Sequence, residues 1–240
     1  MKFNINKKFR SGLAHLRNAY TFSSNVYCKI SFSQEGEDRI LSCLLDGINN
    51  GFYVDVGAHH PKRFSNTYLL YLQGWHGINI DATPGSMVTF NRIRKRDINL
   101  ELAIGNQDKE NIFYEFDEPA INSFDINVVS QHVKEGYPIV KQTIIHPKPL
   151  SEVLDAYLLA NQTINLLSID VEGLDSEVLS SNNWDKYRPS FVLVEDLLAT
   201  NYQRIQDSSI RKFMLEKKYD LICKTIRTFI YFDTLVHNEF

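Results

Sequence analysis

The stretch that decides the fold of this 240-residue chain is Gly51-Phe52-Tyr53-Val54-Asp55-Val56-Gly57-Ala58-His59-His60-Pro61. It begins with a run of aromatic and β-branched residues after a glycine, which predicts a strand buried on both faces of a sheet. Asp55 stands at the carboxyl end of that strand, where open α/β sheets bind their ligands. Gly57 lets the backbone approach a ligand closely, because it has no Cβ atom. The stretch therefore predicts a ligand site at a strand end.

A second short apolar strand, Gly77-Ile78-Asn79-Ile80-Asp81, also ends in an acid. In nucleotide-binding α/β units an acid at this position accepts hydrogen bonds from both ribose hydroxyls. We therefore expect the tips of the two strands to hold an adenosine cofactor. The loop after the first strand has a single glycine and a proline without an N–H, whereas a pyrophosphate needs several backbone donors. This favours S-adenosylmethionine over a dinucleotide.

Strand-like and helix-like segments alternate along the rest of the chain. The alternation predicts an α/β fold, in which a mainly parallel sheet is covered by helices on both faces. Two final strands, 220–223 and 228–232, are too close for a helical crossover and must pair antiparallel. We expect the other strands at 52–56, 77–81, 98–104, 111–116, 164–173 and 190–196, and helices at 67–73, 86–94, 151–159, 175–181 and 210–218. The proline-rich segment 117–150 looks irregular, like loops that shape substrates in α/β enzymes.

Composition bounds the class of protein. The chain is 43% hydrophobic and 23% charged, which is typical of a globular domain. Its net charge of −3 argues against nucleic acid as a partner. The three cysteines, Cys28, Cys43 and Cys223, form no CxxC pair and favour a reduced, cytoplasmic setting. No transmembrane segment or signal peptide is expected. Residues 1–32 are predicted to form an N-terminal helical extension and residues 33–240 the cofactor-binding domain, with the oligomeric state open and a homo-oligomer included.

Acids recur at the predicted strand ends. They are Asp55, Asp81, Asp170 with Glu172, and Glu195 with Asp196. Because parallel strands end at one edge of a sheet, we expect these carboxylates to gather there. Their repulsion would have to be offset by a cation, a hydroxyl-rich ligand or shared protons. A helix start near residues 31–38 also brings Gln34 and Glu37 to the rim of the predicted pocket, although capping of that helix explains its serines and acids equally well.

Taken together, five segments resemble the FkbM-type methyltransferases, a family of S-adenosylmethionine-dependent enzymes with a class I Rossmann-like fold. The segments are residues 33–38, 53–61, 65–68, 74–81 and 168–173, and the resemblance extends over roughly 33–232. It implies a seven-stranded, mainly parallel sheet with an antiparallel last strand. It also implies that Asp81 holds the ribose. It places Asp55, Gly57 and Ala58 around the methionine and sugar part of the cofactor, and Ala103 beside the adenine. His59, Asn66 and Ala82 are further predicted cofactor-binding residues. The usual ribose acid of the family is glutamate followed by proline, whereas Asp81-Ala82-Thr83-Pro84 stands here.

The resemblance implies a hydroxyl acceptor, because family members are mostly O-methyltransferases acting on sugars and other natural products. An alkyl hydroxyl holds its proton nearly as tightly as water, with a pKa of about 16, so it needs activation. Asp170 or Glu172 is the expected general base, with His60 as a rival alongside His59 and His146. A second hypothesis places a divalent cation, Mg²⁺ or Mn²⁺, on Asp170, Glu195 and Asp196. Expected substrate contacts are Asn122, Ser123 and Tyr137.

Two other functions stay open at this point. An NAD-dependent sugar oxidoreductase would use the same α/β scaffold, but it predicts a fuller glycine fingerprint and a Tyr-x-x-x-Lys pair, and neither stands in a suitable place. A non-catalytic binding domain would also keep the sheet. The acids at four of the predicted strand ends argue against such a silent domain.

Overall fold

The computed structural model of the protein describes residues 27–106, 111–199 and 201–235. The chain divides into two compact units, Met1–Ser31 and Phe32–Phe240. Almost all of the predicted N-terminal helical extension lies outside the described residues. None of the described helices combines the length and the apolar character that crossing a membrane requires. The second unit carries all the elements that follow.

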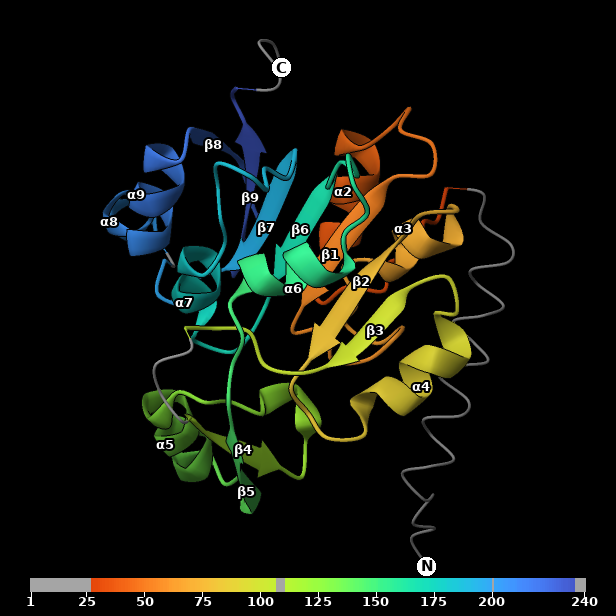
Figure 1. Ribbon diagram of the computed structural model, residues 1–240. Coiled ribbons are helices and arrows are strands. Elements are labelled where there is room, and N and C mark those ends of the chain that lie inside the picture. Colours follow the sequence, from red (N-terminus) through yellow and green to blue (C-terminus); the bar gives the residue numbers. More distant parts are fainter. Residues whose placement is uncertain (1–26, 107–110, 200, 236–240) are drawn as a thin grey trace, which may run out of the picture. The chain divides into compact units, whose positions relative to one another are not determined.

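A seven-stranded sheet forms the centre of this unit (Figure 1). Its strands, in spatial order, are β3 (Ile98–Glu101), β2 (His76–Asp81), β1 (Phe52–Val56), β6 (Leu166–Ile169), β7 (Phe191–Glu195), β9 (Thr228–Asp233) and β8 (Tyr219–Lys224). Strand β1 pairs in parallel with both β2 and β6, and β6 pairs in parallel with β7. Strand β9 runs antiparallel to its two neighbours, β7 and β8. The mainly parallel sheet with an antiparallel last strand, predicted from the sequence, is confirmed.

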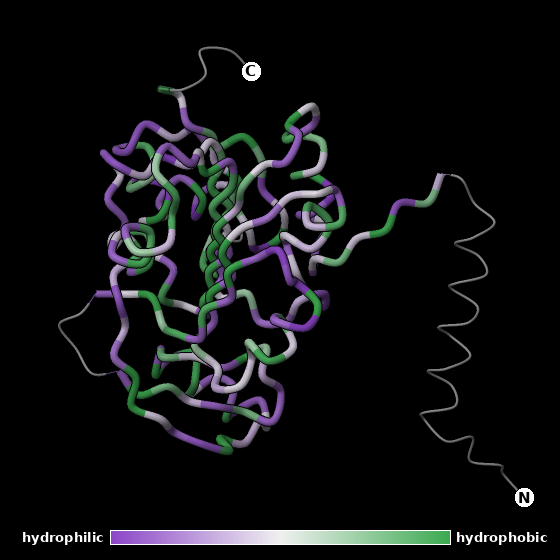
Figure 2. Tube along the Cα trace, turned by 45° about the vertical axis from the view of Figure 1, so that its right-hand side comes forward, coloured by the Kyte–Doolittle hydropathy of each residue, from purple (hydrophilic) through white to green (hydrophobic). Residues whose placement is uncertain are grey.

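Alternating side chains of the strands divide the core into two layers. On one face, Val54 and Val56 pack with α6 (Leu150–Tyr157), α7 (Asp175–Ser180) and α9 (Ser209–Glu216). On the other face, Tyr53 packs with α2 (Glu37–Leu44) and α3 (Tyr68–Leu72). Figure 1 shows α6 in front of the sheet and α2 behind it, and Figure 2 shows hydrophobic residues concentrated in the central strands. Since a strand exposes successive residues to opposite faces, burial on both sides requires the unbroken apolar runs seen in the sequence.

A separate lobe, residues 111–145, lies beyond the carboxyl ends of the parallel strands (Figure 1). It contains β4 (Asn111–Phe116), the 3₁₀ turn η1 (Pro119–Ile121), α5 (Ile126–Lys134) and β5 (Ile139–Ile145). Strands β4 and β5 form their own antiparallel sheet. The expectation of an irregular segment here was wrong. Pro119 occupies the first position of η1, where its missing N–H costs nothing, and the side chain of Asp125 caps α5 by accepting from the Asn127 N–H.

Most predicted elements form with shifted ends, and outside the lobe one helix was missed. Strand β3 is shorter than expected, and α8 (Tyr202–Asp207) precedes α9 without having been predicted. The first turn of α2 follows Gly36 in a left-handed conformation, with φ of 90°, rather than a capping serine. Instead Ser33 Oγ both donates to Asp38 and accepts from the Asp38 N–H.

Similarly α6 begins at Leu150, directly after Pro149 and one residue before the predicted start. The remaining helix, α4 (Ser86–Ile93), packs beside β3.

Candidate active site

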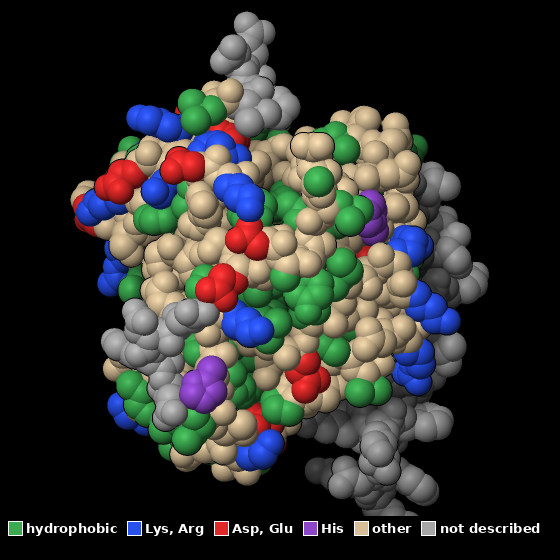
Figure 3. Space-filling view, in the orientation of Figure 1, with side chains coloured by type: hydrophobic (Ala, Val, Ile, Leu, Met, Phe, Trp, Pro, Cys, Tyr) green, Lys and Arg blue, Asp and Glu red, His purple; other side chains and the backbone are tan. Residues whose placement is uncertain are grey.

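A cavity of about 920 Å³ opens between the carboxyl ends of the parallel strands and the lobe. It is lined at the sheet edge by Gly57 after β1, Asp81 at the end of β2, Asp170 after β6 and Glu195 at the end of β7. The space-filling view in Figure 3 shows acidic and basic side chains interspersed on the molecule's face. The cavity lies where the strand-end acids predicted a ligand site, and its volume suits a cofactor-sized molecule.

At the β2 end of the cavity, backbone donors hold the carboxylate of Asp81. Its Oδ2 accepts from the His59 N–H at 2.8 Å, and its Oδ1 accepts from the Thr83 N–H at 2.8 Å. Each oxygen retains a further lone pair, so the carboxylate can still accept from a pair of hydroxyls. Leu102 and Ile104 line the cavity nearby. A fixed acid beside apolar side chains suits the ribose and the adenine ring of an adenosine.

Gly57 lies between the end of β2 and the end of β6 at the carboxyl edge of the sheet. Its backbone has a φ of +81°, and a Cβ atom placed on it would lie 1.7 Å from the carbonyl oxygen of Asp170. On the other side, the N–H groups of Gly57 and Ala58 both donate to the carbonyl of Ile80 in β2. The glycine is therefore required by the close approach of the chain to its own backbone, which the sequence-based argument, framed around a ligand, did not foresee.

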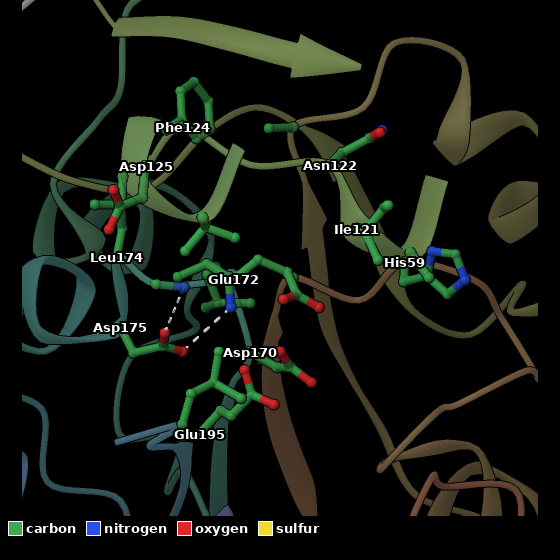
Figure 4. A pocket seen from close by; sticks show the side chains of 18 of the residues that line it. His59, Ile121, Asn122, Phe124, Asp125, Asp170, Glu172, Leu174, Asp175 and Glu195 are labelled. Atoms are coloured by element: carbon green, nitrogen blue, oxygen red, sulfur yellow. Dashed lines mark hydrogen bonds between the residues drawn. The ribbon is translucent and has the colours of Figure 1, made fainter. Parts of the chain in front are cut away.

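Three carboxylates meet at the other end of the cavity. One carboxylate oxygen from each of Asp170, Glu172 and Glu195 lies within 4.8 Å of the other two. Figure 4 shows the three side chains side by side at the ends of β6 and β7. The parallel register pairs Ile169 with Val194, so the residues that follow these two, Asp170 and Glu195, lie next to each other at the carboxyl edge of the sheet. We call Asp170, Glu172 and Glu195 the acid cluster.

The backbone brings Glu172 into the acid cluster by an unusual conformation. Glu172 has a φ of +52°, in the left-handed region that non-glycine residues seldom occupy. The Ser123 hydroxyl of the lobe donates to the Glu172 carbonyl at 2.8 Å. This bond helps to hold the turn, and it explains the place of Ser123, which was expected to contact a substrate.

The acid cluster is poor in donors. Glu195 is only 6% exposed, and its Oε2 has no hydrogen-bond partner among the described residues. By contrast, the neighbouring Asp175 accepts from the N–H groups of Val171 and Gly173, both at 3.2 Å (Figure 4). A buried oxygen without a donor raises the free energy of the folded state, so the acid cluster does not stabilise the fold and is a candidate for a functional role.

Asp196, predicted to be a cation ligand, lies outside the acid cluster. Its Oδ1 accepts from the N–H groups of Leu198 and Ala199, and its Oδ2 accepts from the Ser208 hydroxyl at 2.6 Å. These bonds organise the turn after β7 and the start of α9. Glu172 takes the third place in the carboxylate set instead, because the left-handed turn after β6 directs it back toward Glu195.

Burial sets the protonation behaviour of the acid cluster. Desolvation raises the pKa of Asp170, Glu172 and Glu195, and the repulsion among their neighbouring carboxylates raises each pKa further. The guanidinium of Arg227 acts in the opposite direction on all three. That arginine is shared, because it also lies 3.5 Å from Glu35, and its side chain is 46% exposed.

Asp55 is not among the described residues that line the cavity. It lies on the α2–α3 face of the sheet, where Thr67 Oγ1 donates to its Oδ2 at 2.6 Å. Thr67 in turn accepts from the fully buried Arg94, which also pairs with Asp97 at 2.8 Å. Burial raises the pKa of Asp55. Direct contact of this acid with a cofactor, as the resemblance implied, stays a prediction, whereas its part in a buried network is plain.

The other predicted residues are divided between the cavity and the surrounding structure. Gln34, His59 and Ala82 line the cavity, as does Asn122, one of the expected substrate contacts. Ala58, His60, Asn66, Ala103, Tyr137 and His146 are absent from its lining among the described residues, and so is Glu37.

Two of these residues away from the cavity have clear structural partners. Glu37 Oε1 accepts from the hydroxyls of Thr225 and Thr228, which ties α2 to the end of the sheet. The Asn66 side chain donates to Ser168 Oγ at 3.3 Å.

His60 is occupied in its own loop. Its Nδ1 accepts from the N–H groups of Lys62 and Arg63, and burial together with these two cations lowers its pKa. A nitrogen that already accepts two backbone bonds has no lone pair free to take a proton from a substrate, so the geometry favours a structural role over the expected catalytic one. His59 differs, since it lines the cavity and its Nε2 has no partner in the described part of the chain.

The lobe supplies a wall that sequence reasoning missed. Phe113, Phe124, Asn127, Gln131 and His132 line the cavity from this side. No periodic signal marked them, because their proximity to the strand ends results from tertiary packing alone. A paired ion bridge also links the loop after β1 to the lobe, as the two terminal nitrogens of Arg63 donate to the two oxygens of Glu118 at 3.1 Å.

The strand order, the antiparallel last strand and the cavity at the carboxyl edge define a class I methyltransferase fold. The methyltransferase FkbM domain matches residues 55–221, and the chain belongs to this family of S-adenosylmethionine-dependent methyltransferases. The resemblance noted in the sequence is thereby confirmed. No curated protein sequence matches the chain significantly.

Two solved structures are similar over most of their length. One is a TehB-like S-adenosylmethionine-dependent methyltransferase from Corynebacterium glutamicum, with a TM-score of 0.39 and 9% identity over 95% of this chain and 100% of that one. The other is a candidate RNA methyltransferase from Pyrococcus horikoshii, with a TM-score of 0.43 and 13% identity over 90% of this chain and 96% of that one.

Proposed function

We propose that this protein transfers the methyl group of S-adenosylmethionine to a hydroxyl of a saccharide or a related natural product. The observation that carries the proposal is the placement of two different acidic sites in one cavity. Asp81, held by backbone donors, lies at the β2 end, and the acid cluster lies at the ends of β6 and β7. One site is suited to holding a hydroxyl-bearing cofactor and the other to activating an acceptor.

In this proposal the residues at the β1 and β2 ends hold the cofactor. The carboxylate of Asp81 accepts from the ribose hydroxyls, and Leu102 and Ile104 flank the adenine. The cofactor supplies an electrophilic methyl group on a sulfonium, and S-adenosylhomocysteine remains after transfer. Gln34 and His59, two further residues of the expected binding set, also line the cavity.

The acid cluster readies the acceptor. A carboxylate of Asp170 or Glu172 accepts the hydroxyl proton as the oxygen forms its bond to the methyl carbon, so that no free alkoxide has to form. Both residues line the cavity and are partly exposed, and neither carboxylate accepts a hydrogen bond from another described residue. A base must be within reach of its substrate and must not already be saturated with donors. Both conditions are met here, and they are not met by His60.

A saccharide acceptor is supported by the wall that the lobe supplies. Phe113 and Phe124, with ring centroids 4.7 Å apart, stand beside the amides of Asn122, Asn127 and Gln131. Apolar ring faces suit the C–H faces of a sugar, and amide groups both donate to and accept from hydroxyls.

Binding and transfer can be tested separately. S-adenosylhomocysteine at about one hundred times its Kd should stabilise the protein by about 2.7 kcal/mol, whereas NAD should have no effect on the melting temperature. Radioactive methyl transfer to a panel of mono- and disaccharides should then yield a product whose methyl ether is identified by NMR. Stabilisation by NAD alone would point to an oxidoreductase. Binding of S-adenosylhomocysteine with methylation only at nitrogen acceptors would overturn the choice of a hydroxyl.

A further inference from the structure

We propose that Asp170, Glu172 and Glu195 bind one divalent cation of the hard, oxygen-seeking class, such as Mg²⁺, Mn²⁺ or Ca²⁺. The site itself follows from the geometry of the acid cluster. Its part in catalysis rests on the proposed function above.

The spacing of the three carboxylates matches one coordination sphere. One oxygen from each residue lies within 4.8 Å of the oxygens of the other two. Oxygen ligands lie about 2.1 Å from Mg²⁺ and about 2.4 Å from Ca²⁺, so three ligands spread evenly around one ion are about 3.6 to 4.2 Å apart. A single ion can therefore contact all three side chains after small rotations that bring the carboxylates closer together.

The buried oxygen of Glu195 is a second observation that points to a ligand. The residue is 6% exposed, its Oε2 has no partner among the described residues, and Figure 4 shows its carboxylate directed toward Asp170. Leaving a buried carboxylate oxygen without a donor costs free energy that a bound cation would recover. The absence of donors is local, because Asp175 and Asp196 nearby each accept backbone N–H bonds.

Positive charge from the protein does not balance the cluster. Arg63 and Arg227 are the two arginines that line the described cavity, and each is paired with a glutamate. Arg63 lies 3.1 Å from Glu118, and Arg227 lies 3.5 Å from Glu35. When ionised, the three neighbouring carboxylates therefore carry an excess of negative charge that a divalent ion would offset.

Asp170 and Glu172 line the cavity, so an ion on them would face it. Three monodentate carboxylates leave about three of the six positions around Mg²⁺ for water or for hydroxyls. A hydroxyl that bound there would lose its proton more readily, because the ion would stabilise the developing negative charge, and the free oxygen of monodentate Asp170 or Glu172 would accept that proton. The class of acceptor that fits is one with neighbouring oxygens, as in a diol.

The test is a titration of the full-length protein with Mn²⁺ after treatment with EDTA and dialysis, with free Mn²⁺ followed by electron paramagnetic resonance. We expect saturable binding of one Mn²⁺ per chain, displaced by excess Mg²⁺ or Ca²⁺. The Glu195→Gln variant keeps the size of the side chain and should bind Mn²⁺ more weakly by on the order of tenfold or more. The matched control is Glu118→Gln, which makes the same change elsewhere in the cavity lining and should bind as the wild type does.

The proposal is overturned if the folded wild type shows no saturable binding, or if Glu195→Gln binds as tightly as Glu118→Gln. Circular dichroism establishes that each variant is folded. Should Glu195→Gln not fold, Asp170→Asn replaces it under the same criteria. Methyl transfer that persists in EDTA would remove the catalytic role of the ion and leave the proposed function standing. Failure to bind S-adenosylhomocysteine would remove the proposed function, while the Mn²⁺ titration would still decide the ion site.

Discussion

Two acidic regions face the same cavity, and they differ in how their carboxylates are satisfied. Asp81 accepts one backbone N–H on each oxygen, at 2.8 Å, so the folded chain holds it in place. In the acid cluster, by contrast, Glu195 Oε2 is buried without a donor among the described residues. The β2 end is therefore prearranged for a ligand with hydroxyl donors. At the β6–β7 end, a cation or a proton would stabilise carboxylates that the protein itself does not satisfy.

The largest effect is expected where the two regions are joined. In Gly57→Ala, the new Cβ would lie 1.7 Å from the Asp170 carbonyl oxygen, at a φ of +81°. Because that atom belongs to the backbone, the strand ends would have to separate, and we expect a loss of about 3 kcal/mol or more in the free energy of unfolding. Urea denaturation measures it.

Gly85→Ala is the matched control for that variant. Gly85 has a φ of +82°, yet a Cβ atom there would meet nothing within 4 Å. Only the backbone strain remains, so the cost should be about 1 kcal/mol. Equal losses in the two variants would contradict the view that Gly57 is needed for close packing.

The next effect concerns the acid cluster. Asp170→Asn removes a charge and a proton acceptor while conserving shape, and kcat should fall by about 100-fold or more. Affinity for S-adenosylhomocysteine, measured by calorimetry, should stay within about twofold of the wild type, because Asp170 is assigned to the acceptor side. If Asp170→Asn lost affinity for the cofactor but kept the wild-type kcat, the acid cluster would belong to the cofactor site and not to the acceptor site.

A smaller effect is expected at the other region. Asp81→Asn halves the capacity to accept from the ribose hydroxyls, and the Kd for S-adenosylhomocysteine should rise by about tenfold, equivalent to about 1.4 kcal/mol. Methyl transfer at saturating cofactor should change less than it does in Asp170→Asn. An unchanged Kd, with the variant folded, would argue that Asp81 only shapes the loop after β1.

The smallest effect is expected for the pH dependence of stability, and it concerns Asp55, a buried carboxylate that lies outside both regions and accepts from Thr67. Burial raises its pKa, so the folded state holds this proton more tightly than the unfolded state does. Its contribution to stability is therefore present at low pH and is lost as the pH rises above about 4 toward the folded-state pKa. Asp55→Asn cannot ionise, so the difference in unfolding free energy between the variant and the wild type should shift in favour of the variant between pH 4 and pH 7. A shift in the opposite direction would show that Asp55 is held ionised.

Much of the fold could be predicted because its signals are local. The buried strands are unbroken apolar runs, and each parallel strand that bears on the cavity ends near an acid. The secondary structure of the lobe was harder to predict. Its prolines hid a helix and a strand, since a proline at the first position of a helical turn is compatible with regular structure. The position of Glu172 could not be predicted either, because its left-handed φ depends on contacts with the lobe.

By itself, the sequence determined the order of the elements, the sheet edge at which the acids collect and the family to which the chain belongs, because strand periodicity and short motifs are properties of neighbouring residues. Only the tertiary structure decided which acids meet. It directed Glu172 toward Glu195, gave Asp196 to the turn before α9 and buried Asp55 beneath Thr67. The physical reason is that a carboxylate's role depends on the donors that surround it, and those donors come from segments far apart in the chain.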